Sequence, residues 1–350
     1  MKRLLPLLVL ALAACATPSA RPHTDRLGLD ALTAAVETGA YQRIEAIIVE
    51  RDGAILYERY FGEAGPDTRI DARSAGKSIT ALALGAAIDD GMIASVDAPA
   101  LAYFDAEAPI AHDSPVKRAV TLRDLLTMSS ALDCDDWREE SPGNEERMYE
   151  TRDWTRFALD IPATDGYVRD AQGYGRFSYC TAGAFLLGRI VERAAGEPFD
   201  AYVERRLFAP LGIVAPEWRR SPLGQVQSGG QLGLRARDFQ ALGRLVLDDG
   251  VAPDGRRLVS AQWLREMTTP VRQANSDDGY GYLWWTRSFS AAGARRYHSA
   301  YMSGNGGNKV VVVPELDAVV VVLSTVYNQP TMHRQSTDLI ERHILPTLRL

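Results

Sequence analysis

Lysine is scarce in this chain of 350 residues, which has four in all: Lys2, Lys77, Lys117 and Lys309. The formal net charge is −6, and no run of basic residues follows the first three positions. A nucleic-acid-binding surface needs clustered positive charge, so we expect no nucleic-acid partner. Because 46% of the residues are hydrophobic, the chain can build one large core or two joined lobes.

Several common enzyme motifs are also absent from the sequence. The sequence has no GxSxG nucleophile elbow, no HExxH zinc motif and no CxxC pair. Its five histidines are scattered along the chain. We therefore expect neither a metal ion nor an organic cofactor.

The N-terminus carries an apolar run too short to span a bilayer, which takes roughly 20 residues. Lys2 and Arg3 precede this run, which extends from Leu4 to Ala14, as in a secretory signal. The following Cys15 completes a Leu-Ala-Ala-Cys sequence that resembles the lipobox of bacterial lipoproteins.

These features predict a signal peptide over residues 1–14, lipidation of Cys15 and a tether over residues 15–28. Ala16 fits retention in the outer membrane, so we expect a periplasmic protein anchored there by its lipid. Ordinary cleavage near Ala20 is the alternative.

Two further cysteines, Cys134 and Cys180, lie in the body of the chain. In an oxidising compartment two such residues often pair, and we expect a Cys134–Cys180 disulfide. The bond requires Cα atoms within about 7 Å of each other. Two separate buried thiols are the alternative.

Strand-like sequence lies at both ends of the chain, with helical sequence between. Residues 43–62 contain two β-rich runs around Asp52-Gly53, which is a hairpin signal. Residues 308–324 form two hydrophobic runs around a Pro-Glu-Leu-Asp turn. This order predicts an α+β fold in which one sheet draws on both ends, with an inserted helical lobe and a cleft between the lobes.

The stretch at residues 72–78, Ala-Arg-Ser-Ala-Gly-Lys-Ser, fits two different sites. Gly76-Lys77-Ser78 could end a phosphate-binding loop, but that loop needs a glycine where this chain has Asp71. The Asp71 carboxylate would repel a polyphosphate. The other interpretation is SxxK, a nucleophilic serine followed one helical turn later by a lysine.

The SxxK interpretation fits the surrounding sequence. Ser74 starts an apolar helical stretch, and Lys77 lies on the same helix face, where it can act as a base for the hydroxyl. A lysine covering a capping serine is the structural alternative. A second SxxK, Ser114 to Lys117, lies in polar sequence, and we expect that lysine to be solvated.

Two later segments complete the pattern. Tyr179 precedes a helix and could relay a proton. A glycine-rich segment around Asn305 enters a late strand, so the main-chain N–H groups of Ser74 and Asn305 could form an oxyanion hole.

The chain resembles the serine hydrolases related to class C β-lactamases and penicillin-binding proteins. The resemblance lies in the order of three motifs: SxxK, then Tyr-Cys-Thr at 179–181, then a glycine-bearing late strand. The branch with esterases and 6-aminohexanoate-oligomer hydrolases is the most similar. The resemblance spans most of residues 40–350. It implies one β-lactamase/transpeptidase-like domain over 29–350 with an antiparallel sheet flanked by helices. Its α/β lobe would comprise about 29–73 and 275–350, and its helical lobe about 74–274.

The resemblance also implies roles by position. Ser74 would be the acylated nucleophile, Lys77 its base and Tyr179 the proton relay, while Asn305 would supply an oxyanion N–H. The substrate-binding positions would be Thr181, Ser303 and Gly304.

Two departures from the family pattern affect substrate choice. Thr181 replaces an asparagine, and Met302-Ser303-Gly304 stands where relatives have Lys-Thr-Gly or His-Thr-Gly. Without that cation, carboxylate-bearing substrates such as β-lactams should bind less well. Arg295 or Arg296 could supply the charge, and the third motif could instead begin at His298.

Other residues have both a functional and a structural interpretation. Four tryptophans could line a pocket or fill the core: Trp137, Trp154, Trp284 and Trp285. A cluster of carboxylates is expected to be a solvated loop: Asp135, Asp136, Glu139 and Glu140.

The sequence thus predicts an exported serine hydrolase acting on a small-molecule ester, amide or β-lactam, with an ester or amide favoured. A β-lactamase or D-alanyl-D-alanine carboxypeptidase is the alternative among enzymes. A non-catalytic envelope lipoprotein that retains the fold is the alternative from another class.

Overall fold

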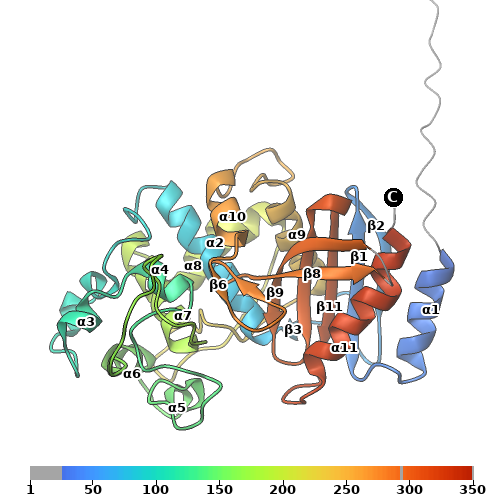
Figure 1. The fold of residues 1–350 in the computed structure, drawn as a ribbon. Coiled ribbons are helices and arrows are strands. Elements are labelled where there is room, and N and C mark those ends of the chain that lie inside the picture. Colours follow the sequence, from blue (N-terminus) through green and yellow to red (C-terminus); the bar gives the residue numbers. More distant parts are fainter. Residues whose placement is uncertain (1–25, 292–294, 349–350) are drawn as a thin grey trace, which may run out of the picture.

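A computed structural model describes residues 26–291 and 295–348 of the chain. Within them, an antiparallel sheet in the order β2-β1-β11-β10-β9-β8-β7-β6 joins the two ends of the sequence (Figure 1). Its strands are β1 (Ile44–Arg51), β2 (Ala54–Tyr60), β6 (Arg272–Gln273), β7 (Gly279–Tyr280), β8 (Trp285–Ala291), β9 (Arg295–Gly304), β10 (Asn308–Val313) and β11 (Ala318–Ser324). The predicted sheet built from both ends is confirmed.

The predicted hairpins form at the expected turns. Asp52 and Gly53, both with positive φ, connect β1 to β2, which suits the tight turn of a two-stranded hairpin. A short 3₁₀ turn over Pro314–Leu316 connects β10 to β11. Because β1 pairs with β11, the two hairpins lie side by side and form one end of the sheet, with β2 at its edge.

Helices cover both faces of this sheet (Figure 1). Helices α1 (Arg26–Glu37) and α11 (Met332–Leu339) lie on one face, and α9 (Ala236–Leu247) packs against β1, β10 and β11 on the other. Every residue of β10 and β11 is buried, with successive side chains entering opposite cores. Two covered faces explain why these strands are continuous hydrophobic runs.

The remaining helices form the inserted region between β3 and the late strands. They are α2 (Gly76–Asp89), α3 (Pro115–Arg118), α4 (Leu122–Leu126), α5 (Glu145–Tyr149), α6 (Trp154–Asp160), α7 (Thr181–Ala195), α8 (Phe199–Val203) and α10 (Ala261–Thr268). A small second sheet was not expected from the sequence. Its strands, β3 (Ile70–Asp71), β4 (Glu217–Trp218) and β5 (Leu232–Leu234), follow the order β3-β5-β4.

Helix α2 is central to the position of the site. Its residues from Gly76 to Ala87 are all buried, and a Cβ atom on Gly85 would lie 2.2 Å from the Trp263 ring. Small residues therefore let α2 pack closely against its neighbours and give the turn before it a rigid base.

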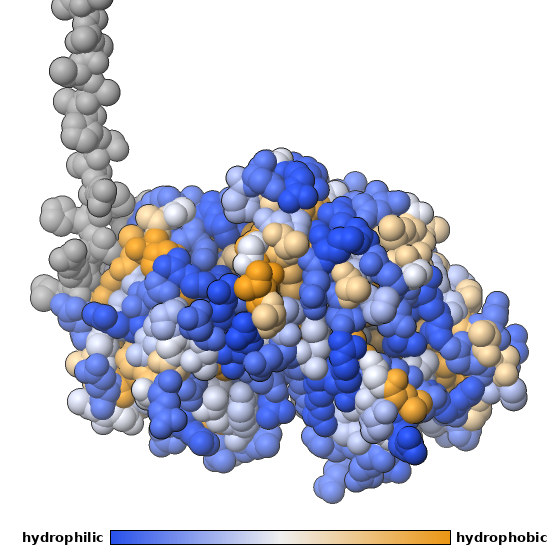
Figure 2. Space-filling model, turned by 180° about the vertical axis from the view of Figure 1, so that it is seen from behind, coloured by the Kyte–Doolittle hydropathy of each residue, from blue (hydrophilic) through white to orange (hydrophobic). Residues whose placement is uncertain are grey.

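Two expectations concern the first residues of the chain. The predicted signal peptide, residues 1–14, and Cys15 lie outside the described residues. The predicted tether ended at residue 28, whereas α1 begins at Arg26. None of the helices in residues 26–291 and 295–348 has the length and apolar character needed to cross a membrane. Viewed from behind, the surface is largely hydrophilic with scattered apolar patches (Figure 2).

Candidate active site

Ser74 lies in a short 3₁₀ turn, Arg73–Ala75, between β3 and α2. Arg73 has a φ of +54°, a conformation that a non-glycine residue holds only when its surroundings fix it. The Arg73 N–H donates to the Asp71 carboxylate over 2.8 Å, and its guanidinium lies 4.4 Å from the centre of the Tyr327 ring. Asp71, which excludes a phosphate loop, thus holds the turn that presents Ser74.

Lys77 lies one helical turn after Ser74, and its side chain is buried, with 1% of its surface exposed. Its Nζ donates to Ser74 Oγ over 3.0 Å and to the Gly229 carbonyl over 2.7 Å. The glycine segment that supplies this carbonyl packs directly on the turn, since a Cβ on Gly230 would lie 3.3 Å from Ser74 Cα. The structure therefore joins the serine and the lysine as the SxxK spacing predicts.

Tyr179 adds a phenol to the pair. It lies directly before Cys180, the N-cap residue of α7, and the Lys77 Nζ is 4.9 Å from the centre of its ring. Burial raises the pKa of Tyr179, while the charge of Lys77 and the interaction with the Ser74 hydroxyl act in the opposite direction. The phenol is therefore protonated in neutral solution.

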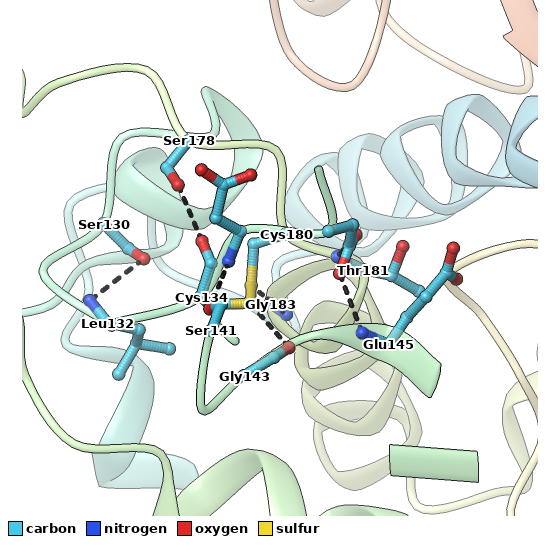
Figure 3. The surroundings of a disulfide bond; sticks show 12 residues. Ser130, Leu132, Cys134, Ser141, Gly143, Glu145, Ser178, Cys180, Thr181 and Gly183 are labelled. Carbon is cyan, nitrogen blue, oxygen red and sulfur yellow. Dashed lines mark hydrogen bonds between the residues drawn. A yellow bond between two sulfur atoms is a disulfide. The ribbon is translucent and has the colours of Figure 1, made fainter. Parts of the chain in front are cut away.

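A disulfide joins Cys180, the residue after Tyr179, to a second loop (Figure 3). Cys134 and Cys180 are bonded with their Cα atoms 5.4 Å apart, which is the pairing expected from the sequence. The Ser178 hydroxyl donates to the Cys134 carbonyl over 2.7 Å and adds a second link. The bond therefore holds the loop containing Asp136 beside Tyr179.

Asp136 corrects an expectation from the sequence. It does not lie in a solvated loop but is partly buried and lines the cleft that contains Ser74. Its carboxylate accepts from the main-chain N–H groups of Thr181 and Glu145 over 2.7 and 2.9 Å. Burial, with the nearby Glu145 carboxylate, raises the pKa of Asp136 to about 7, and the Coulombic effect of Lys77 opposes that rise.

Thr181 is the second correction. The sequence suggested a substrate-binding residue, but its side chain is fully buried and does not border the cleft. Thr181 instead contributes its main-chain N–H to Asp136. Thr181 begins α7, and its side chain packs against the glycine segment, since a Cβ on Gly229 would lie 2.8 Å from the Thr181 Cγ2.

The late glycine segment approaches the serine from the sheet. Gly304 ends β9, and a Cβ on it would lie 1.8 Å from the Ala72 carbonyl oxygen, so only glycine fits there. The Asn305 side chain is bonded to Asn328, with contacts of 2.6 and 2.8 Å. In the described part of the chain, the N–H groups of Ser74 and Asn305 donate no hydrogen bond, which leaves both available to a ligand.

The arginines proposed as substitutes for the missing cation lie elsewhere. Arg295 and Arg296 are at the opposite end of β9 from Gly304, roughly 30 Å along the strand. Arg295 pairs with Glu315, and Arg296 donates to the Ser288 carbonyl. His298, the alternative start of the third motif, is exposed and bonds Ser288. The strand length separates all three from the serine.

The residues brought together border one cleft of about 620 Å³. Ser74 and Tyr179 come from the segments before α2 and α7, Ser303 and Gly304 end β9, and Asn305 follows them. Of the four tryptophans, Trp137 and Trp285 line the cleft, whereas Trp154 and Trp284 are buried in the core. The cleft also contains Lys309, for which no local pattern in the sequence indicated a role.

The second SxxK sequence is structural. The expectation that Lys117 is solvated is wrong, because its side chain is 1% exposed. Its Nζ donates to the Ala111 carbonyl over 2.7 Å. The Ser114 hydroxyl accepts from the Lys117 N–H and caps α3. The short helix α3 directs the Lys117 side chain into the protein, and the polar sequence around it did not indicate this burial.

A serine bonded to a lysine one helical turn later, at a cleft between a sheet and a helical region, defines a serine hydrolase of the SxxK type. The chain belongs to the β-lactamase family, because the family model described as Beta-lactamase matches residues 33–343. Homologues that are hydrolases support the same enzyme class.

Individual relatives share moderate similarity. The 6-aminohexanoate-dimer hydrolase of Paenarthrobacter ureafaciens is 29% identical over 308 residues, which is 83% of this chain and 74% of the relative. The lovastatin esterase of Penicillium rubens is 28% identical over 62% of this chain and 58% of its own length. The solved structure of simvastatin synthase from Aspergillus terreus shares the fold, with a TM-score of 0.68, 17% identity, and coverage of 93% and 98% of the two chains.

Proposed function

We propose that this protein hydrolyses a small-molecule ester or amide through an acyl-enzyme on Ser74. The observation that carries the proposal is the 3.0 Å contact between Lys77 Nζ and Ser74 Oγ in a cleft open to a ligand. The names of two relatives, a 6-aminohexanoate-dimer hydrolase and a lovastatin esterase, support this choice of substrates.

In acylation, Ser74 Oγ attacks the substrate carbonyl carbon and gives up its proton to Lys77. The oxygen of the tetrahedral intermediate accepts hydrogen bonds from the N–H groups of Ser74 and Asn305, which are free to donate. The bond to the leaving group then breaks, and the alcohol or amine departs with a proton. Burial keeps the Tyr179 phenol protonated, so it holds a proton for the leaving group, and Lys77 then replaces that proton.

In deacylation, water attacks the acyl carbon through the same oxyanion site. One water proton passes to the Lys77 and Tyr179 pair and then to Ser74 Oγ as the acyl bond breaks. The products are a carboxylic acid and the regenerated serine, so one water is consumed for each ester or amide cleaved. None of these steps requires a cofactor.

We also propose that the protein is exported and lipid-anchored, which rests on residues 1–20. The disulfide at the site fits an oxidising compartment. Labelling the lipid of the full chain in a bacterial host, beside a Cys15→Ser variant, tests the anchor. Incorporation that persists in the variant would contradict it.

A fluorophosphonate probe tests the catalytic proposal against a non-catalytic lipoprotein. We expect the wild type to be labelled and Ser74→Ala to be unlabelled, because the probe needs an activated serine. Equal labelling of both proteins, or of neither, would contradict the proposal. A penicillin in the same series distinguishes the β-lactamase and carboxypeptidase alternatives by rapid turnover or by stable labelling.

A further inference from the structure

Lys309 is a buried cation that faces the active-site cleft. It is the second residue of β10, is 3% exposed, and pairs with Ser303 on the neighbouring strand β9. Directly opposite residues in an antiparallel pair project to the same face of the sheet. Lys309 and Ser303 therefore reach the same cleft that contains Ser74.

The ammonium group of Lys309 has no protein partner. Over the described residues, no hydrogen-bond acceptor contacts its Nζ and no carboxylate oxygen lies within 4.0 Å. The centre of the Tyr301 ring lies 4.7 Å from the Nζ. By contrast, the Nζ atoms of the other two buried lysines, Lys77 and Lys117, donate to carbonyl oxygens over 2.7 Å. His333 also lines the cleft, and burial together with the charge of Lys309 lowers the pKa of that imidazole to about 3.

The neighbouring carboxylate is already bonded to other groups. Asp278 accepts from Arg287 over 2.6 and 3.0 Å, from the Tyr301 hydroxyl over 2.7 Å and from Asn275 over 2.9 Å. These contacts use both of its oxygens. Burial lowers the pKa of Lys309 to about 7, with a Coulombic effect of Asp278 in the opposite direction and one of Arg287 in the same direction.

A buried cation without a partner costs free energy that an incoming anion can offset. We propose that Lys309 binds a carboxylate of the substrate, so that the preferred ester or amide carries a negative charge in its acyl or its leaving group. This inference rests on the proposed hydrolase function. The nearby Asp277 and Asp278 favour a monoanion over a more highly charged group such as a phosphate dianion.

Lys309 thereby supplies, from β10, the positive charge that the segment Met302–Gly304 lacks. Ser303 lies directly opposite Lys309 on β9, and Ser74 and Asn305, which supply the two oxyanion N–H groups, border the same cleft. A carboxylate bound there would fix the substrate relative to Ser74, which lowers KM and aligns the carbonyl for attack.

Two matched pairs of esters test the inference. The first pair, p-nitrophenyl hexanoate and the p-nitrophenyl monoester of adipic acid, differs by a carboxylate on the acyl side. The second pair, the hexanoate esters of p-hydroxybenzoate and of its methyl ester, differs by a carboxylate on the leaving group. We expect kcat/KM of the wild type to favour the charged member of one pair by roughly tenfold or more, as a charge-assisted hydrogen bond provides.

Variants assign the preference to Lys309. Lys309→Met should reduce the preference to about one, mainly through KM, and Lys309→Arg should retain part of it. Lys117→Met removes a buried lysine away from the cleft and should leave the ratio unchanged. Circular dichroism confirms folding, and Lys309→Gln replaces Lys309→Met if that variant does not fold.

The possible failures are distinguishable. A wild type that hydrolyses both members of each pair equally well overturns the inference without any variant, as does a preference that survives in Lys309→Met. If instead no ester is hydrolysed faster by the wild type than by Ser74→Ala, the proposed function itself fails.

Discussion

The exposed indole of Trp137 stacks on the buried phenol of Tyr179, with their ring centres 5.5 Å apart and their planes within 1° of parallel. Trp137 is 60% exposed, so it covers Tyr179 from the solvent side of the cleft. The stacking therefore contributes to the burial that raises the pKa of Tyr179.

Removing this cover should change the pH dependence of the reaction. In Trp137→Ala water reaches the phenol, so the pKa of Tyr179 should fall and the alkaline limb of kcat/KM should move to lower pH by roughly one unit. Trp137→Phe retains an aromatic cover and should shift the limb less. A pH–rate profile that is the same for all three proteins would show that Trp137 does not control this ionisation.

The raised pKa of Asp136 predicts a pH-dependent stability. A carboxyl group with a higher pKa in the folded than in the unfolded chain stabilises the fold while it is protonated. This contribution is complete below about pH 4, the ordinary range of an aspartate, and is lost as the pH rises through about 7.

The comparison with Asp136→Asn isolates that contribution. We expect the free energy of unfolding to fall less steeply in the variant than in the wild type between about pH 4 and pH 7. Urea unfolding at several pH values measures both slopes, and the difference in slope is independent of any constant cost of the substitution. Parallel curves would contradict a raised pKa at Asp136.

The disulfide should support both the fold and the site. Its cysteines are 46 residues apart, and the chain-entropy estimate for such a loop is about 3–4 kcal/mol. A Cys134→Ser and Cys180→Ser double variant should lose stability of this order and also lose activity, because Asp136 and Tyr179 are then held less firmly. Serine at position 180 can still cap α7.

Denaturant unfolding and kcat measurements check this expectation. They compare the double variant with the wild type under oxidising and under reducing conditions. The reduced wild type should behave like the double variant. A stable double variant with unchanged kcat would show that the bond does not position the site.

The close approach of β9 to the serine turn predicts an intolerant glycine. Gly304→Ala places a Cβ against the Ala72 carbonyl, so we expect displacement of the oxyanion N–H groups and a fall in kcat/KM of roughly 100-fold or more. Gly65→Ala is the matched control. A Cβ at position 65 would meet no atom within 4 Å, and Gly65 does not have a positive φ. Equal activity of the two variants would contradict this account of the β9 end.

Local patterns in the sequence were sufficient for much of the fold. The hairpin at Asp52-Gly53 and the strands around residues 314–317 follow from turn chemistry and hydrophobic runs, and the Ser74–Lys77 contact follows from helix periodicity. The three-stranded second sheet was missed because its strands have only two or three residues, too short for any periodicity.

The residues that surround Ser74 could not be predicted from local patterns in the sequence. Asp136 lines the cleft because a disulfide holds its loop against α7, and Lys309 faces the cleft because of its register with Ser303. Both depend on contacts between segments far apart in the chain. Lys309 shares one face of β10 with Val311 and Val313, and a lysine on this otherwise apolar face could have drawn attention.

The central claim is that Ser74 carries the acyl group during turnover. Rapid acid quench of the wild type with p-nitrophenyl hexanoate, followed by intact-mass analysis and peptide mapping, tests it most directly. We expect a hexanoyl adduct on Ser74 that disappears as substrate is consumed, and no adduct on Ser74→Ala. Substrate turnover with an adduct on another residue, or undiminished turnover by Ser74→Ala, would contradict it.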